Sequence, residues 1–243
     1  MTSARRTRDR PIGVPAADAG ARFTEFSVGA ESLARRLLGM TLVRVDEVGR
    51  CAGVIVETEA YLGVADRAAH TFGGRRTARN ASMWLEGGHA YVYFTYGMHW
   101  CFNVVAGGAE VPEAVLVRAL RPTEGLDRMV RRRGLTTPER LCAGPARLTQ
   151  ALAIDRSHDG ADLCRSETIF IECGGGARRR IVVGPRIGIA SAGDWAGRPL
   201  RFCLAGEERW WSKGAIAAGA QKPNPGRGGD HTAPRNPRGL AAG

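Results

Sequence analysis

Two carboxylates and a phenol ring alternate along one short apolar segment of this chain. Residues 54–61 read Val-Ile-Val-Glu-Thr-Glu-Ala-Tyr, and the period of two along a strand places Glu57, Glu59 and Tyr61 on one face. The two glutamates would then lie about 6.6–6.8 Å apart along the strand. A carboxylate in such a place can deprotonate water or bind a divalent cation. A half-exposed strand with solvated acids is the alternative on this pattern alone.

A long polar loop follows this segment. Residues 62–81 contain His70 and a Gly-Gly-Arg-Arg-Thr-Ala-Arg-Asn run that includes Arg75, Arg76 and Arg79. Loops of this length inside a domain usually carry function. Glycine beside arginine suits a close approach to phosphate groups. A structural histidine and a solvated basic loop are the alternatives.

An aromatic hairpin comes next along the chain. Residues 90–95 and 100–105 have the composition of strands, and Tyr-Gly-Met-His at 96–99 reads as the tight turn between them. Tyr96 and Met98 would therefore lie at the tip and face away from the core. Exposing both is costly unless they meet an apolar partner.

The remaining pattern predicts an α+β fold, a single domain with a curved, largely antiparallel β-sheet flanked by a few helices. We expect a disordered basic arm at 1–22, the folded domain at 23–212 and a disordered Gly/Pro-rich tail at 213–243. The other predicted strands are 42–45 and 51–61, which form a hairpin, and 114–120, 169–171, 181–183, 187–189 and 200–204. The predicted helices are 30–38, one that opens at Pro122-Thr123-Glu124 and ends at Gly134, and one that starts at Gly144-Pro145.

The charge balance favours a polyanionic partner. Lys and Arg number 35 against 24 Asp and Glu, which gives a formal charge of +11. Nucleic acid and an anionic membrane surface both fit such a surplus, and so does a general bias toward basic residues. No apolar run approaches the ~18 residues of a membrane span, so we expect no membrane partner.

The cysteines and histidines indicate neither a disulfide framework nor zinc. Six cysteines and five histidines lie scattered, without a C-x-x-C pair or the spacing of zinc ligands. We expect reduced thiols in a cytoplasmic protein with no metal and no cofactor.

The residues considered so far, together with several further segments, resemble one known family. These segments are Glu57–Gly63, Asp66, Ala68–His70, Gly73–Arg75, Tyr91–Tyr93, Tyr96–Met98, Cys101, Asn103, Val117–Leu120, Cys142–Pro145, Leu148, Gln150–Ile154, Trp195 and Pro199–Phe202. The chain is similar, over about 30–205 and in the same order, to the alkylpurine (3-methyladenine) DNA glycosylases of the alkyladenine glycosylase type. The pattern departs after Met98, where the family has an aromatic residue and this chain has His99.

The resemblance implies a base-flipping repair enzyme that hydrolyses the N-glycosidic bond of damaged purines in double-stranded DNA. It makes Glu59 the base that activates water, with Arg118 helping to hold that water. Tyr61, His70 and Tyr93 would sandwich the flipped base, and Asn103 would disfavour unmodified guanine.

The resemblance also implies how the enzyme meets its substrate. Tyr96 and Met98 would intercalate at the hairpin tip. From the Gly/Arg pattern of the loop we expect Arg75, Arg76 and Arg79 to contact the DNA backbone. We expect a monomer associated with the nucleoid.

The chemistry of the reaction is consistent with these roles. A carboxylate can stabilise an oxocarbenium-like sugar while it deprotonates water. A lyase step needs an amine, and the only lysines, Lys213 and Lys222, lie beyond the predicted domain. We therefore expect an intact abasic strand as the product.

Two alternatives of other classes remain open from the residues. A metal-dependent nuclease would use Glu57, Glu59 and Asp66 as Mg²⁺ ligands. A non-catalytic nucleic-acid-binding module would use the aromatic residues for stacking.

Overall fold

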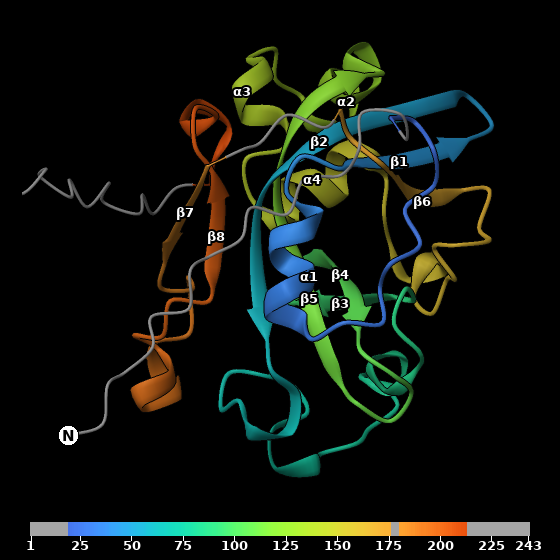
Figure 1. Cartoon of the computed structure of the whole chain (residues 1–243). Coiled ribbons are helices and arrows are strands. Elements are labelled where there is room, and N and C mark those ends of the chain that lie inside the picture. The colour runs from blue at the N-terminus through green and yellow to red at the C-terminus, as the bar shows by residue number, and fades with distance from the viewer. Residues whose placement is uncertain (1–18, 176–179, 213–243) are drawn as a thin grey trace, which may run out of the picture.

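An eight-stranded sheet organises the protein (Figure 1), in a computed structural model that describes residues 19–175 and 180–212. The strand order is β3-β4-β5-β2-β1-β6, β8 pairs with β2 and β7, and the pairings are antiparallel. The strands are β1 (Thr41–Asp46), β2 (Gly49–Tyr61), β3 (Ala90–Thr95), β4 (His99–Ala106), β5 (Glu113–Glu124), β6 (Ile169–Glu172), β7 (Ile181–Gly184) and β8 (Arg201–Leu204). The predicted α+β class with a curved, largely antiparallel sheet is confirmed.

Strand β2 is the centre of this sheet. One of its edges pairs with β5, while the other pairs first with β1 and then, at residues 57–59, with β8. Its apolar, β-branched residues suit a strand that is buried on both faces. The register with β5 shifts on both sides of Glu57, so a bulge interrupts the regular alternation there.

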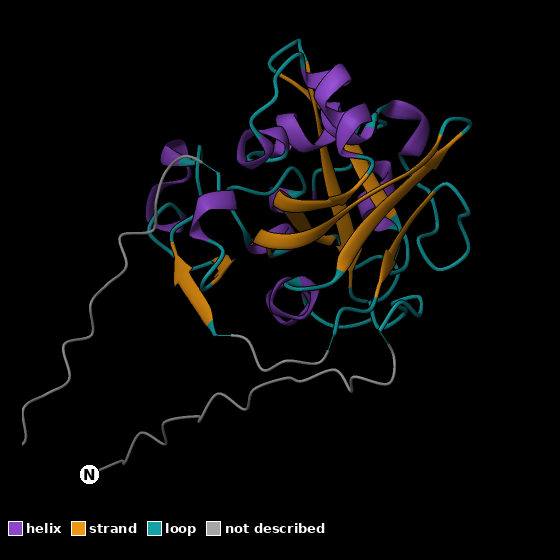
Figure 2. Cartoon of the chain, turned by 90° about the horizontal axis from the view of Figure 1, so that it is seen from above, coloured by secondary structure: helices purple, strands orange, loops and turns teal. Residues whose placement is uncertain are grey.

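The helices cover the sheet from two sides. They are α1 (Ala30–Leu37), α2 (Leu126–Arg133), α3 (Pro138–Leu141) and α4 (Pro145–Leu152), and short 3-10 turns lie at Gly63–Ala65, Phe72–Gly74, Ala81–Trp84, Arg156–His158, Ala190–Trp195 and Glu208–Trp210. Figure 2 shows one helix end-on at one side of the strands and most other helices gathered at the opposite side.

Helix α1 covers the strand that carries the two glutamates. Its buried face, which includes Leu33 and Leu37, packs on β2 and β5 with the spacing that the sequence predicts. The hydroxyl of Thr58 on β2 donates to the carbonyl of Ala34 at 2.9 Å. The side of β2 opposite its carboxylates is thus fixed by packing and by one buried hydrogen bond.

Two predicted elements differ from the structure. Residues 122–124 continue β5 instead of opening a helix, because Glu124 pairs with Ala52 and Pro122 falls at a bulge where a proline is tolerated. Helix α2 starts after Gly125, whose φ of +71° makes the turn. Residues 187–189 form no strand but an irregular segment. Helix α3 was not predicted.

The described residues include the last part of the predicted N-terminal arm. Residue 20 already donates to the carbonyl of Cys173, and Arg22 bridges Glu172, so the folded part includes the last residues of the predicted arm. The rest of 1–22 and the tail 213–243, with Lys213 and Lys222, lie outside the described residues. Within the described ranges, no helix is both long and apolar enough to cross a bilayer.

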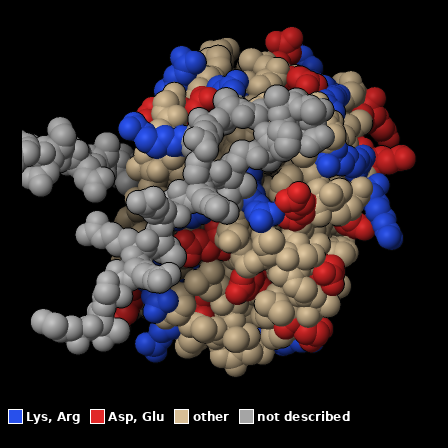
Figure 3. Space-filling model, in the orientation of Figure 1, with Lys and Arg blue, Asp and Glu red and all other residues tan. Residues whose placement is uncertain are grey.

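Charge on the face that carries α1 is mixed. Figure 3 shows basic and acidic side chains interspersed there instead of a continuous basic field. The basic surplus of the sequence therefore does not single out this face for a polyanion.

Candidate active site

The two carboxylates of β2 lie inside the protein. Glu57 and Glu59 are both 0 % exposed. The alternative of a half-exposed strand with solvated acids is therefore wrong. A buried carboxylate needs several donors or a cationic partner to remain ionised, and the two glutamates meet that need in different ways.

Glu59 accepts two hydrogen bonds and forms one ion pair. Its Oε2 accepts from the hydroxyl of Tyr61 at 3.0 Å and lies 3.2 Å from Nη1 of Arg118. Its Oε1 accepts from the backbone N–H of Ile187 at 2.8 Å. Burial raises the pKa of Glu59, and the positive charge of Arg118 with the two donated hydrogen bonds opposes that rise.

Glu57 is saturated by donors of its own. Its Oε1 accepts from Nε of Arg118 at 3.0 Å, from Nε of Arg201 at 2.7 Å and from the hydroxyl of Ser212 at 2.8 Å. Its Oε2 accepts from the backbone N–H of Ser212 at 2.6 Å. Glu57 is therefore part of a buried ionic network and does not face the pocket.

Asp66 is likewise engaged by a buried arginine. Arg186 donates to both carboxylate oxygens of Asp66, at 2.5 and 2.9 Å, and both side chains are fully buried. The same guanidinium donates to the carbonyl of Ala60 and lies over the ring of Tyr61, 4.7 Å from its centroid. This ion pair fixes the loop after β2 against the strand that carries Glu59.

These contacts disfavour the magnesium-nuclease alternative. The oxygens of Glu57, Glu59 and Asp66 face guanidinium groups, which neutralise the charge that would attract a cation. Across residues 19–175 and 180–212, no three His, Cys, Asp or Glu side chains gather as ligands for a metal ion.

A pocket of about 430 Å³ opens beside Glu59, and the side chains that contact Glu59 form part of its lining. Its size lies in the range of small-ligand sites. The six residues predicted for catalysis and base binding lie together here. Five of them line the pocket, and Glu59 is buried in contact with two of these five, Tyr61 and Arg118. The predicted residues in the lining are Tyr61, His70, Tyr93, Asn103 and Arg118.

One end of the pocket is aromatic. The ring of His70 meets that of Tyr93 edge-on, with centroids 4.5 Å apart, and Tyr93 stacks on Tyr91 at 5.2 Å. Nδ1 of His70 lies 2.7 Å from the hydroxyl of Tyr91. Burial, helped by the charges of Arg79 and Arg75, lowers the pKa of His70 to about 4. The imidazole is therefore neutral at physiological pH, which suits stacking on a base.

Asn103 is held by the backbone of the same aromatic strand. Its Nδ2 donates to the carbonyl of Tyr91 at 3.0 Å, and the side chain is buried in the pocket wall. A buried amide with one hydrogen bond fixed in this way presents its remaining polar atoms in a constant direction.

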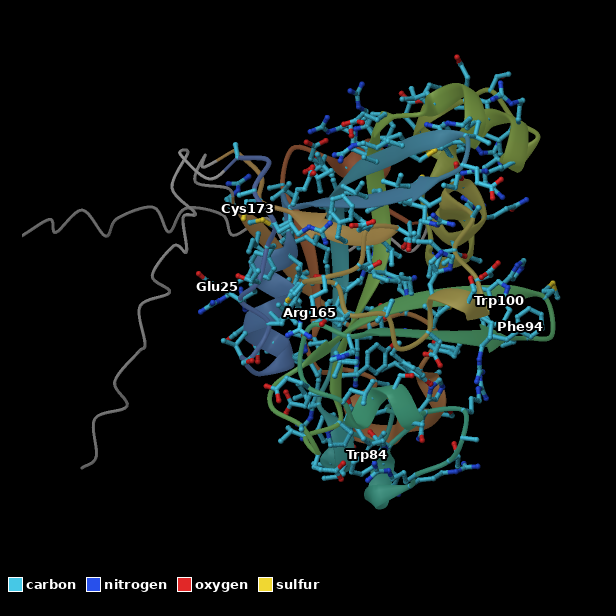
Figure 4. The ribbon with its side chains drawn as sticks, turned by 90° about the vertical axis from the view of Figure 1, so that its right-hand side faces the viewer. Glu25, Trp84, Phe94, Trp100, Arg165 and Cys173 are labelled. Carbon is cyan, nitrogen blue, oxygen red and sulfur yellow. The ribbon has the colours of Figure 1, made fainter. Side chains whose placement is uncertain are left out.

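The predicted wedge residues lie at a hairpin tip, as expected. Tyr96 is 82 % exposed and Met98 is 66 % exposed. Tyr96 also has a φ of +51°, a conformation that tyrosine seldom adopts. Figure 4 shows the hairpin extending from the body, with Phe94 and Trp100 side by side near its end. The centroids of these two rings are 4.8 Å apart, so the side chains of the strand ends pack on each other while the two turn residues are exposed.

The three predicted backbone-binding arginines differ in their surroundings. Arg76 forms a two-pronged ion pair with Glu110, at 2.7 and 3.1 Å. Arg79 donates to the carbonyl of Phe94 at 2.8 Å and thereby links the loop to the hairpin. Arg75 is exposed. Arg75 and Arg79 flank the aromatic end of the pocket, whereas part of the charge of Arg76 is neutralised on the surface.

Sequence reasoning missed several site residues. Ile187 contributes a backbone N–H, which no side-chain pattern reveals, and it lies in a segment predicted as a strand. Arg201 and Ser212 reach Glu57 from β8 and from the end of the described chain. Tyr91 was noted only as part of an aromatic strand. The one available signal was the arginine content of apolar segments around Arg186 and Arg201, because a buried arginine needs a carboxylate partner.

Comparison with known proteins was informative over most of the chain. The family model described as Methylpurine-DNA glycosylase (MPG) matches residues 24–208. The DNA-3-methyladenine glycosylase of Mus musculus is 44 % identical over 194 residues, which cover 74 % of this chain and 58 % of the mouse protein. The human DNA-3-methyladenine glycosylase is 43 % identical, over 74 % of this chain and 64 % of the human protein. A putative 3-methyladenine DNA glycosylase of Granulibacter bethesdensis is 47 % identical, over 82 % of this chain and 90 % of that protein.

Proposed function

The chain belongs to the methylpurine-DNA glycosylase family, and on that premise we propose that it is a monofunctional base-excision-repair glycosylase. It would flip an alkylated purine out of duplex DNA and hydrolyse the N-glycosidic bond with water. Deaminated and etheno purines form the wider substrate range to be tested. The matched region spans only 58 % and 64 % of the two mammalian relatives, so activity, substrate and partner are proposed for this chain in its own right.

The observation that carries the proposal is the position of Glu59 behind an aromatic pocket. Its Oε2 is occupied by Tyr61 and Arg118, whereas among the described residues Oε1 accepts only from the N–H of Ile187. A carboxylate oxygen has about two acceptor sites. Oε1 therefore has one acceptor site left, which the proposal assigns to the reacting water molecule.

The reaction then follows from general chemistry. As the bond between C1′ and the purine nitrogen breaks, the electron pair leaves with the base and the sugar becomes oxocarbenium-like. The negative charge of Glu59 stabilises that cation. Water adds to C1′ and its proton passes to Glu59, which leaves an abasic sugar and a free base. A purine alkylated at N3 or N7 already carries positive charge and needs no further proton to depart.

The substrate would be held by stacking and by electrostatics. The flipped base would lie between Tyr61 on one side and the rings of His70 and Tyr93 on the other, with Asn103 reading its edge. Extruding a nucleotide costs a few kcal/mol, which Tyr96 and Met98 would offset by filling the gap. Arg75 and Arg79 would contact the nearby phosphates, and Arg76 would join them if Glu110 releases it.

The proposal places the enzyme in the cytoplasm as a monomer that reaches the nucleoid by binding DNA. Cys51, Cys101, Cys142, Cys164 and Cys203 are free thiols, which is compatible with a reducing compartment.

The test is release of free base from defined duplexes that contain methylated, deaminated or etheno purines. We expect free base from at least the methylated duplex, equal rates with and without EDTA, and an intact strand until alkali is added. Absence of base release from each duplex would refute the glycosylase. Loss of activity in EDTA would restore the nuclease alternative, and scission before alkali would indicate a lyase.

A further inference from the structure

Arg118 uses each nitrogen of its guanidinium on a different partner. Nε donates to Glu57 at 3.0 Å, Nη1 lies 3.2 Å from Glu59, and Nη2 donates to the hydroxyl of Ser212 at 3.3 Å. The guanidinium is planar, so fixing two of its nitrogens fixes the direction of the third. Glu57 and Ser212 thus determine where Nη1 lies relative to the carboxylate of Glu59.

The supporting partners are themselves held firmly. Ser212 donates to Glu57 through both its backbone N–H and its hydroxyl, at 2.6 and 2.8 Å, and is 7 % exposed. Arg201 adds a further donor to Glu57 at 2.7 Å from β8. Trp210, two residues before Ser212, is also buried. The network therefore joins the end of the described chain to the strand that carries Glu59.

The charges of this network balance. Two carboxylates, Glu57 and Glu59, face two guanidinium groups, Arg118 and Arg201, in a buried site. Removing one member of such a group leaves an uncompensated buried charge. Glu57 is therefore needed to keep Arg118 and Arg201 together, a function separate from that of Glu59.

We propose that Glu57 and Ser212 are positioning residues, which hold Arg118 against Glu59 so that the carboxylate keeps its orientation toward the reacting water. This role rests on the proposed glycosylase function. It assigns a task to the second carboxylate of the Glu-Thr-Glu segment and to the end of the described chain, neither of which touches the pocket.

The direction in which the pKa of Glu59 changes when Glu57 is replaced tests this positioning role. Arg118 lowers the pKa of Glu59 and Glu57 raises it, with the effect of Arg118 the larger. The other titratable or charged groups around Glu59 are Tyr61, Tyr93, Cys101, Arg186, Arg201 and Cys203. If Glu57 were only a nearby negative charge, Glu57→Gln would lower the pKa of Glu59. If Glu57 holds Arg118 in place, its loss frees Arg118 and the pKa of Glu59 rises.

The experiment compares full-length Ser212→Ala and Glu57→Gln with the wild-type protein. The titration midpoint of Glu59 is followed by ¹³C NMR of the glutamate side-chain carboxyl groups, with its signal assigned by its loss in Glu59→Gln. The single-turnover rate of base release and the DNA affinity are measured in parallel. Ser157→Ala is the matched control, because it removes a serine hydroxyl that donates to the carboxylate of Asp155 at 2.6 Å in an exposed turn.

We expect both variants to raise the Glu59 midpoint and Ser212→Ala to slow base release by about 10-fold, since a misplacement of about 1 Å can cost about 100-fold. DNA affinity should not change in either variant. Ser157→Ala should match the wild-type protein in all three measurements. An unchanged midpoint in Ser212→Ala, even with a lower melting temperature, would show a purely structural role. A lower midpoint in Glu57→Gln would also overturn the proposal.

The measurements separate this inference from the glycosylase itself. If Glu57→Gln fails to fold, Ser212→Ala decides alone, because it changes no charge. If the wild-type protein releases no base, the proposed function fails, while the NMR midpoints still decide whether Glu57 and Ser212 position Arg118.

Discussion

The backbone N–H of Ile187 donates a 2.8 Å hydrogen bond to Oε1 of Glu59 across 128 residues of sequence. This contact orients one carboxylate oxygen from a segment that has no regular secondary structure. Because a main-chain donor carries no side-chain freedom, it fixes the plane of the carboxylate at low entropic cost. Four predictions follow from the arrangement around Glu59 and from the exposed hairpin tip.

Glu59→Gln should abolish base release and keep DNA binding. The amide preserves the shape of the side chain but loses the negative charge and the basicity that the reaction needs. Because the amide leaves the two buried guanidinium groups of Arg118 and Arg201 with one carboxylate, that of Glu57, the melting temperature of the variant should fall. Single-turnover excision, DNA affinity and thermal unfolding check these points, with the exposed Glu31→Gln as control. Base release within a few-fold of wild type would move the catalytic role away from Glu59.

The rate of base release should rise with pH through the titration of Glu59, with a midpoint above that of an ordinary glutamate. The direction follows because the raised pKa keeps Glu59 protonated, and inactive as a base, to a higher pH. His70 should add no step between pH 5 and 8, since its pKa is lowered to about 4. A pH–rate profile on a methylated duplex measures both, and a profile that falls through that midpoint would contradict the assignment.

Tyr96→Ala should leave the melting temperature nearly unchanged and weaken action on paired DNA. The ring is 82 % exposed, so its removal loses little buried area, whereas stacking in the vacated gap would contribute about 1–3 kcal/mol. The defect should shrink on a lesion that is already unpaired. Val48→Ala, at another exposed hairpin turn, is the control. A loss of about 3–5 kcal/mol of stability, as for a core aromatic residue, would make Tyr96 a packing residue.

Asp66→Asn should destabilise the protein by about 3–5 kcal/mol, because it leaves the buried guanidinium of Arg186 without its charge partner. Arg186 also donates to the carbonyl of Ala60, so the loop that carries His70 should loosen and substrate affinity should fall. Denaturant unfolding and the KM for base release measure the two effects. The exposed Asp155→Asn should cost less than about 1 kcal/mol, and a similar small loss in Asp66→Asn would refute the argument.

The sequence predicted those parts of the fold where local pattern and tertiary pairing agree. The apolar face of α1 and the hairpin formed by β1 and β2 are such cases. The segment at Pro122 was misassigned because proline at a helix start is a strong local signal, while the bulge opposite Gly53 that tolerates it is a property of the partner strand. Residues 187–189 alternate like a strand, yet they pair with no strand in the part of the chain that the structure describes.

The pocket residues were predicted through the family resemblance, and the groups behind them were not predicted. Tyr61, His70 and Tyr93 stand out as aromatic residues in a polar or β-rich context. The burial of Glu57 could not be predicted, because it depends on Arg201 and Ser212, which lie 144 and 155 residues away. Because every residue except proline has a backbone N–H, the residue type does not reveal which main-chain donor, such as that of Ile187, contacts the site.

The pairing of β2 on both edges has a consequence for how the molecule opens. Residues 57–59 are hydrogen-bonded to β5 on one side and to β8 on the other, so their amide protons are protected until the sheet itself separates. The β3–β4 tip has no strand beyond it and should exchange its amide protons through small local fluctuations. Hydrogen-exchange rates should therefore differ most between these two parts. The hairpin tip proposed to contact DNA could thus adjust to it, while the carboxylate of Glu59 stays on a segment that moves only when the protein unfolds.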